Sequence, residues 1–225
     1  NGDLYPTHDL GPIAKYFNIN RGNRLVSLTS TASKSRGLNA WVTENKKDDE
    51  RLKNFNFALG DVVTTVIKCA HGETIVLYHD TSLPRPYSRA NLLQGTKGIW
   101  QEDKMSVYFD GISEKPHTWE SIEKYYEKYE HPLWKRFREE GVKGGHGGMD
   151  WLVLRAFVEA VQKKEQTPID VYDTATWMAI TCLSEDSIAM GSAPVAIPDF
   201  TDGKWIERDD IVKGPYCLDE VWDGF

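Results

Sequence analysis

A tyrosine and a histidine stand three residues apart near the beginning of the chain, in the run Tyr5-Pro6-Thr7-His8. Side chains at this spacing can share one turn of a helix and face one cavity. An imidazole can take up and return a proton near neutral pH, and a phenol can donate or accept hydrogen bonds beside it. The pair could therefore transfer protons at a carbon or hydroxyl group of a substrate. A surface histidine with a capping role has the same local pattern, so the spacing alone leaves both interpretations open.

A second candidate site is a proline-bracketed segment, residues 84–89, which follows a predicted strand and carries Arg85, Tyr87 and Arg89. The two prolines hold the backbone extended, so these side chains need not join a β-ladder. Loops at strand ends frequently carry binding residues. Arg85 and Tyr87 are therefore candidate substrate contacts, and a rigid edge turn with solvated arginines is the alternative.

The densest glycine run is Gly-Gly-His-Gly-Gly at residues 144–148, and it opens a predicted helix. A glycine-rich loop at a helix N-terminus can cradle an anion. This run has neither the dinucleotide fingerprint nor the P-loop pattern, because no buried strand precedes it and no Lys-Ser or Lys-Thr follows it. A tight turn that brings the helix close to a sheet is the simpler interpretation. His146 and Asp150 remain candidates for the edge of a pocket.

Other arrangements of titratable residues are less favoured. Neighbouring acidic residues at 102–103 and 185–186 could supply a conventional glycosidase pair, but neighbours point to opposite faces of a strand and diverge on a helix. His71 and His79 could converge on a metal across a hairpin. Two solvent-facing histidines are the simpler interpretation, so we expect no metal site.

These candidates need a scaffold, and the first half of the chain has the pattern of β-strands. Strand-like runs cover residues 24–31, 57–69, 74–80, 88–94, 98–102 and 106–109. Residues 71–73 form a turn between the second and third runs and predict a β-hairpin. We expect one antiparallel meander of about six strands. Residues 45–54 are charged, lack apolar periodicity and predict a surface loop.

Helical patterns dominate the remainder. The first helical pattern covers residues 5–16, where Gly11-Pro12 would place a proline in the first turn. Residues 117–140 predict two exposed helical pieces that are separated at His131-Pro132. Two further helices are predicted over residues 149–163 and 170–190. Strands followed by helices predict an α+β domain in which helices pack on one face of an open, predominantly antiparallel sheet.

We expect one domain over residues 1–225, which is long enough to bury a core. Within it, residues 1–20 are expected to form an active-site helix segment, residues 117–140 a helical insertion and residues 193–225 an extended tail. The chain begins at Asn1 and reaches its first motif within a few residues, as expected for part of a longer protein.

Composition narrows the classes of partner. The net charge is -7, and Lys and Arg are scattered among acidic residues, which argues against nucleic acid. No apolar run is long enough to cross a membrane. The three cysteines are odd in number and widely spaced, which argues against a disulfide framework and a cysteine-based zinc site.

Five separated motifs together resemble the C-terminal half of the NAD-dependent α-N-acetylgalactosaminidase-like glycosidases, glycoside hydrolase family 109. This family belongs to the wider group of glucose-fructose and inositol oxidoreductases. The motifs are Tyr-Pro-Thr-His with Leu-Gly-Pro at residues 5–12, Leu-Val-Ser-Leu-Thr-Ser at 25–30, Arg-Pro-Tyr-Ser-Arg at 85–89, Gly-His-Gly-Gly-Met-Asp at 145–150 and Ala-Pro-Val-Ala-Ile-Pro-Asp-Phe at 193–200.

The resemblance implies an upstream Rossmann domain that holds most of the NAD, followed by this domain with an open sheet that commonly mediates subunit pairing. In the family, a hydride is taken from sugar C3, the resulting ketone acidifies the C2 hydrogen, the C1 leaving group is eliminated, water adds, and the hydride returns. Such chemistry needs no conventional carboxylate pair.

Carried over residue by residue, the resemblance implies that His8 is the catalytic acid/base beside the reacting sugar carbons, with Tyr5 in its hydrogen-bonding shell. Tyr87 would contact the sugar. His146 and Asp150 match the glycine-rich motif and would lie near the pocket.

One residue departs from the expected pattern: Asp9 stands where we expect Gly, and its charge could raise the pKa of His8 or narrow the pocket. Two alternatives stay open, namely an NAD(P)-dependent sugar or inositol dehydrogenase of the same superfamily and a non-catalytic sugar-binding or scaffold domain. We expect a glycoside substrate, a homo-oligomer formed through the open sheet face and, by the resemblance, a periplasmic or extracytoplasmic location.

Overall fold

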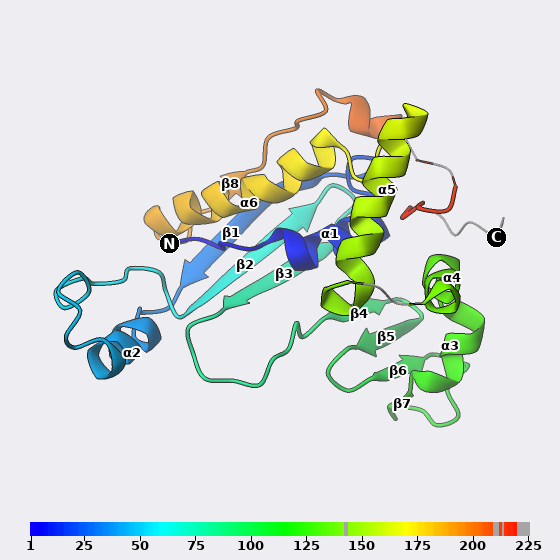
Figure 1. Cartoon of the computed structure of the whole chain (residues 1–225). Coiled ribbons are helices and arrows are strands. Elements are labelled where there is room, and N and C mark those ends of the chain that lie inside the picture. The colour runs from blue at the N-terminus through cyan, green and yellow to red at the C-terminus, as the bar shows by residue number, and fades with distance from the viewer. Residues whose placement is uncertain (142–143, 209–211, 213, 220–225) are drawn as a thin grey trace. The chain divides into compact units, whose positions relative to one another are not determined.

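The computed structural model describes residues 1–141, 144–208, 212 and 214–219. Internal contacts divide the chain into two compact units (Figure 1), and the expectation of a single domain over residues 1–225 stays a prediction. Unit 1 comprises Asn1–Arg85 and Ile169–Ile211, and unit 2 comprises Pro86–Pro168 and Val212–Phe225.

Unit 1 is built on a four-stranded antiparallel sheet in the order β3-β2-β1-β8. Its strands are β1 (Leu25–Ala32), β2 (Val62–Cys69), β3 (Thr74–Asp80) and β8 (Val195–Ala196). The predicted hairpin between β2 and β3 is confirmed, with Ile67 opposite Ile75 and Val63 opposite His79. Gly72 in its turn has a φ of 99°, a left-handed conformation that glycine adopts without a steric penalty.

Two helices, α1 (Thr7–Tyr16) and α6 (Val171–Ala189), cover one face of this sheet (Figure 1). Leu10 of α1 and Ile180 of α6 are fully buried in the apolar core that they form with the strands. Gly11 lets the helices approach closely, because a Cβ there would lie 3.3 Å from the ring of Trp177. This packing fixes α1 and therefore the residues at its N-terminal end.

The start of α1 differs from the prediction. The helix begins at Thr7, so Pro12 lies inside it and not in its first turn. Proline has no backbone N–H, so the helical hydrogen bond from residue 12 to the carbonyl of His8 is absent. The preceding turn is intact, since the Leu10 N–H donates to the Pro6 carbonyl at 2.9 Å. His8 therefore stands in the first turn, as expected.

A network of buried charges ties α1 to α6. The carboxylate of Asp173 accepts hydrogen bonds from Lys15 at 3.2 Å and from Arg21 at 2.8 Å. Asp170 caps α6 by accepting the backbone N–H of Asp173 at 2.9 Å, and it also pairs with Arg208. Buried charges are tolerated when they are paired and hydrogen-bonded, as these are.

Helix α2 (Gly37–Asn45) was not predicted, because only Val42 of this helix is buried and the apolar periodicity is weak. The buried carboxylate of Asp61 holds its beginning, accepting the N–H groups of Arg36 at 2.9 Å and Gly37 at 2.8 Å. The following residues, 46–54, form the expected charged surface loop.

Unit 2 contains a second four-stranded antiparallel sheet in the order β4-β5-β6-β7. Its strands are β4 (Leu92–Gly95), β5 (Gly98–Gln101), β6 (Ser106–Phe109) and β7 (Glu120–Ser121). The α+β class and the antiparallel pairing are confirmed, but the expected single meander of about six strands is wrong. The proline-bracketed residues 84–89 break the ladder, because proline has no N–H to donate.

The helices of unit 2 agree with the sequence pattern. They are α3 (Glu123–Tyr129), α4 (Pro132–Glu140) and α5 (Met149–Lys163), with a short 3-10 turn, η1 (His146–Gly148), before α5. His131 caps α4, since its Nδ1 accepts the N–H of Leu133 at 3.1 Å. Arg155 joins α4 to α5 by donating to Glu140 and Glu159, each at 2.7 Å.

The predicted tail, residues 193–225, contains β8 and a 3-10 turn, η2 (Lys204–Ile206); residues 209–211, 213 and 220–225 lie outside the described residues. Cys69 and Cys182 are free thiols, Cys182 is exposed, and Cys217 is buried. Within the described part of the chain, no helix combines the length and apolar character required to span a membrane.

Candidate active site

Tyr5 and His8 lie together where α1 begins. Their ring centroids are 5.3 Å apart and their planes are inclined by 26°, which is a stacked arrangement. Both side chains are exposed, Tyr5 by 62% of its surface. The backbone of the first turn therefore brings the predicted pair together with both rings accessible to a ligand.

Asp3 lies directly before this pair and was missed by the sequence analysis. It is 3% exposed, its Oδ1 accepts the N–H of Tyr5 at 3.1 Å, and its own N–H donates to Ser184 Oγ of α6 at 2.8 Å. Burial raises the pKa of the Asp3 carboxyl, an effect partly offset by the Tyr5 N–H and the charge of His79. The sequence did carry a signal for this contact, because an Asp side chain commonly accepts a hydrogen bond from the backbone N–H of the residue two positions later, here Tyr5.

The prediction that His79 faces solvent is wrong. His79 is 8% exposed and lies on the same face of β3 as the buried residues Ile75 and Leu77. The period-two alternation of the strand gives this result, because residues 75, 77 and 79 share a face. His71 stays exposed in the hairpin turn. Among the described residues, no three His, Cys, Asp or Glu side chains are grouped closely enough to hold a metal ion.

Arg85 and Tyr87 differ in how accessible they are. Within unit 1, Arg85 Nε lies 3.2 Å from Asp80 Oδ2, and its Nη2 donates to the Asp80 carbonyl at 3.0 Å. Tyr87, in unit 2, is 86% exposed. Arg89, also in unit 2, pairs with Glu102. Tyr87 is therefore the side chain of this segment most available to a ligand.

The glycine-rich loop of unit 2 brings His146 and Asp150 together. His146 Nδ1 lies 3.0 and 2.9 Å from the two carboxylate oxygens of Asp150, and this hydrogen bond raises the pKa of the imidazole. A Cβ at residue 145 would lie 2.6 Å from an Asp150 carboxylate oxygen, so a larger residue there would displace the Asp150 side chain from this position. The loop is thus shaped around this pair, and its two members remain exposed.

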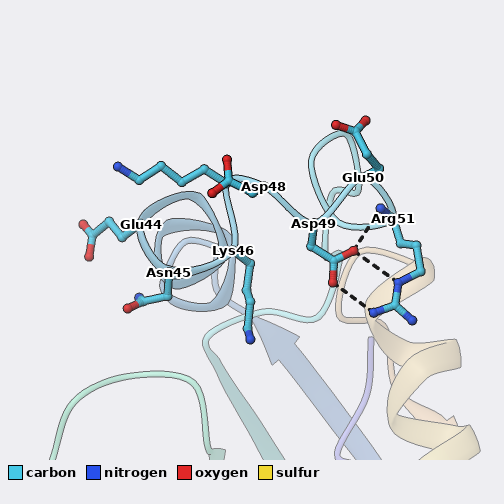
Figure 2. A pocket seen from close by; sticks show the side chains of 8 residues that line it. Glu44, Asn45, Lys46, Asp48, Asp49, Glu50 and Arg51 are labelled. Atoms are coloured by element: carbon cyan, nitrogen blue, oxygen red, sulfur yellow. Dashed lines mark hydrogen bonds and ion pairs between the residues drawn. The ribbon is translucent and has the colours of Figure 1, made fainter.

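A hollow in the described surface lies elsewhere, along residues 44–51, and has a volume of about 750 Å³ (Figure 2). A single charged run of chain lines it. Asp49 and Arg51 pair with each other at 2.9 Å, and this hydrogen bond lowers the pKa of Asp49. Figure 2 shows the charged groups of Glu44, Lys46 and Glu50 pointing in different directions. The hollow offers no converging set of side chains for chemistry.

The glycosyl hydrolase 109 C-terminal domain family matches residues 1–207, which include every residue of the candidate site. The chain belongs to this family. The resemblance carried by the five motifs is thereby confirmed.

Relatives at about half identity support the same assignment. The chain is 49% identical over 208 residues to the alpha-N-acetylgalactosaminidase of Tannerella forsythia, with 92% of this chain and 44% of the relative covered. It is 50% identical to a glycosyl hydrolase family 109 protein of Stenotrophomonas maltophilia, with 94% and 46% covered. The chain thus spans less than half the length of the relatives it matches.

The fold is also found in a solved structure, an oxidoreductase domain protein from Kribbella flavida. The TM-score is 0.52 at 14% sequence identity, over 79% of this chain and 45% of that one. This similarity concerns the fold alone and agrees with the α+β architecture.

Proposed function

We propose that this chain is the substrate-binding part of a glycoside hydrolase that acts on α-linked N-acetylgalactosamine or a related glycoside. The stacked, exposed Tyr5–His8 pair carries the proposal, because it places an acid/base group and a hydrogen-bonding phenol at one accessible point. Membership of the family and the relatives named alpha-N-acetylgalactosaminidase support the substrate class.

In this proposal His8 moves protons at the reacting sugar carbons, taking the proton from C2 and returning one after the leaving group has departed. Tyr5 donates a hydrogen bond to the sugar beside it and restricts the imidazole by stacking. NAD, when bound, would supply hydride transfer at C3. This chemistry needs no conventional pair of catalytic carboxylates.

The remaining candidates are proposed as sugar contacts. Tyr87 offers an exposed ring and hydroxyl. His146 has a raised pKa and can donate from its free ring nitrogen, with Asp150 as its acceptor. Arg85 is engaged with Asp80, so we expect it to orient its loop and contact the substrate only at its edge.

The two sheets of the described residues differ from a Rossmann-type dinucleotide site. Every strand pairing in both sheets is antiparallel, so neither contains the parallel βαβ unit that presents a pyrophosphate to a helix N-terminus. The glycine loop at residues 144–148 also lacks the required spacing. We therefore propose that NAD is held mainly by parts of the full-length protein that this chain does not cover.

The alternative is a sugar or inositol dehydrogenase, which the fold similarity to an oxidoreductase domain protein favours. A dehydrogenase would use the same His8 to take the proton from a hydroxyl group and would release reduced cofactor. The isolated chain, without the rest of its protein, would act at most as a sugar-binding domain.

Substrate tests on the full-length protein distinguish these possibilities. With NAD bound, we expect nitrophenol release from p-nitrophenyl α-N-acetylgalactosaminide and no net NADH, with α- and β-glycosides of galactose and glucose as comparisons. His8→Ala should abolish the release. NADH accumulation without release would support the dehydrogenase, and turnover unaffected by His8→Ala would refute the proposed role of His8.

The sheet of unit 1 also supports a proposal about assembly. One face carries the core, while the other exposes Val66, Val76 and Tyr78 on adjacent strands, with Val66 directly opposite Val76. Exposed apolar residues in register form a continuous surface that a second copy could cover. We propose a homo-oligomer formed through this face.

A further inference from the structure

The residues before the Tyr5–His8 pair are pressed against α6. A Cβ on Gly2 would lie 2.3 Å from Ser184 Oγ and 2.7 Å from the Thr181 carbonyl, so the backbone can lie here only without a side chain. One residue later, the Asp3 N–H donates to Ser184 Oγ at 2.8 Å. The position of Asp3 is therefore fixed by the helix that forms the core of unit 1.

A short series of contacts leads from Asp3 to the proposed acid/base. The Asp3 carboxylate accepts the N–H of Tyr5 at 3.1 Å, which fixes the backbone at the point where α1 begins. The Tyr5 ring then stacks on the His8 imidazole at 5.3 Å. Both rings are exposed, and Asp3 is the buried group that holds the first of them.

Two further titratable groups act on the Asp3 carboxyl. His79 of β3 lowers its pKa and Asp9 of α1 raises it. His79 is nine-tenths buried, and its Nδ1 has no hydrogen-bond partner within the described part of the chain.

We propose that Asp3 is a positioning residue for the Tyr5–His8 pair: anchored on Ser184 and accompanied by the buried His79, it fixes the backbone of Tyr5 so that the phenol ring orients the imidazole. The kinetic part of this inference rests on the proposed function. Asp3 itself is buried and acts through Tyr5.

The test compares Asp3 with a matched control in the full-length enzyme. Asp61 is the control, because it is also a buried aspartate of unit 1 that accepts backbone N–H groups, but it holds α2. The variants are Asp3→Ala, Asp3→Asn and Asp61→Ala. Asp3→Leu, which keeps the approximate shape but has no acceptor, replaces Asp3→Ala should that variant not fold.

We expect Asp3→Ala to lower kcat by roughly tenfold to a hundredfold with little change in KM, because a misplaced acid/base slows chemistry more than binding. Asp3→Asn should restore kcat to within about threefold of wild type, since its amide oxygen can still accept the Tyr5 N–H. Asp61→Ala should leave kcat within about threefold.

A second readout does not depend on activity. The nuclear Overhauser effect between the rings of Tyr5 and His8, measured in protein with labelled Tyr and His, should disappear in Asp3→Ala and persist in Asp3→Asn and Asp61→Ala. An Overhauser effect that survives in Asp3→Ala, or in Asp3→Leu where that variant replaces it, would overturn the inference, as would an equal loss of kcat in Asp61→Ala. A wild-type enzyme without glycosidase or dehydrogenase turnover would refute the proposed function. The Overhauser measurement would then decide whether Asp3 positions the Tyr5–His8 pair.

Discussion

Units 1 and 2 contain similar elements but differ in how they are stabilised. Unit 1 encloses an apolar core contributed by two helices and four strands, with a buried charge network beside it. In unit 2, α5 keeps apolar side chains exposed, among them Val153, Leu154 and Phe157. His8 lies in the first turn of α1 in unit 1 and Tyr5 lies just before it, whereas in unit 2 Tyr87 lies on a loop and His146 begins the short turn η1. The proposed proton transfer is thus assigned to the better-packed unit and the sugar contacts to loops.

The largest expected effect concerns the charge network of unit 1. Asp173→Ala should reduce the free energy of unfolding by about 3–5 kcal/mol, because Lys15 and Arg21 would stay buried after losing the carboxylate with which they pair. Urea denaturation followed by tryptophan fluorescence measures it. Asp150→Ala, in the exposed pair of unit 2, is the control and should cost less than about 1 kcal/mol. Equal effects would contradict the comparison between the units.

The same network makes unit 1 sensitive to acid. Burial tends to raise the pKa of Asp173, but the hydrogen bond from Arg21 and the charge of Lys15 outweigh it and hold the pKa below its ordinary 3.8. A carboxyl group whose pKa is lower in the folded state than in the unfolded chain stabilises the fold at pH values above its unfolded-state pKa. This stabilisation is lost as the pH falls through the folded-state pKa. We expect unfolding monitored by circular dichroism to become easier below about pH 4 in wild type, and this acid dependence to be weaker in Asp173→Asn. An identical acid profile would contradict the assignment.

Apolar truncations give the next contrast. Ile180→Ala, at a fully buried site of unit 1, should cost about 2–5 kcal/mol through lost burial and a cavity. Leu154→Ala, on the exposed side of α5, should change stability by less than about 0.5 kcal/mol. Thermal and urea unfolding of the two variants measure both values. A large cost for Leu154→Ala would mean that α5 is covered in solution.

The exposed sheet face tests the assembly proposal. Val76→Lys with Tyr78→Lys should convert the oligomer to a monomer without loss of fold, because both side chains point away from the core. Sedimentation velocity of wild type and double variant measures this. A wild type that is strictly monomeric at micromolar concentration would refute the oligomer.

The smallest effect is the titration of His146. Its Asp150 partner raises its pKa, so the midpoint in an NMR titration should lie above the ordinary 6.5. An imidazole whose pKa is higher in the folded state than in the unfolded chain stabilises the loop at pH values below its unfolded-state pKa. This stabilisation is lost as the pH rises through the folded-state pKa. Asp150→Asn should return the midpoint to near 6.5. An unchanged midpoint in that variant would show that another group sets the titration.

Local patterns predicted most of the strands and helices because their spacing is local, but they missed α2 and the two-residue strands β7 and β8. The limits of β3, β6 and α5 follow from alternation and helical periodicity, and the Tyr5–His8 turn follows from a three-residue spacing. The division into two sheets did not follow, because it depends on which strands pair across the proline-bracketed residues 84–89. Pairing between distant strands leaves no signature within either strand.

The site residues show the same limit. Asp3 is anchored by a contact with Ser184, 181 positions away along the chain, which no spacing rule indicates. His79 was within reach of sequence reasoning, since the alternation of Ile75 and Leu77 extends to it. The partners of Lys15 and Arg21 again lie more than 150 positions away and became visible only with the packing of α1 on α6.

The most direct test of the proposed chemistry is hydrolysis of p-nitrophenyl α-N-acetylgalactosaminide by the full-length, NAD-loaded enzyme in D₂O, followed by mass spectrometry and NMR of the released sugar. If His8 takes the C2 proton and a solvent proton is returned, the product carries one non-exchangeable deuterium at C2. A product with hydrogen retained at C2 would contradict the exchange of the C2 proton with solvent through His8.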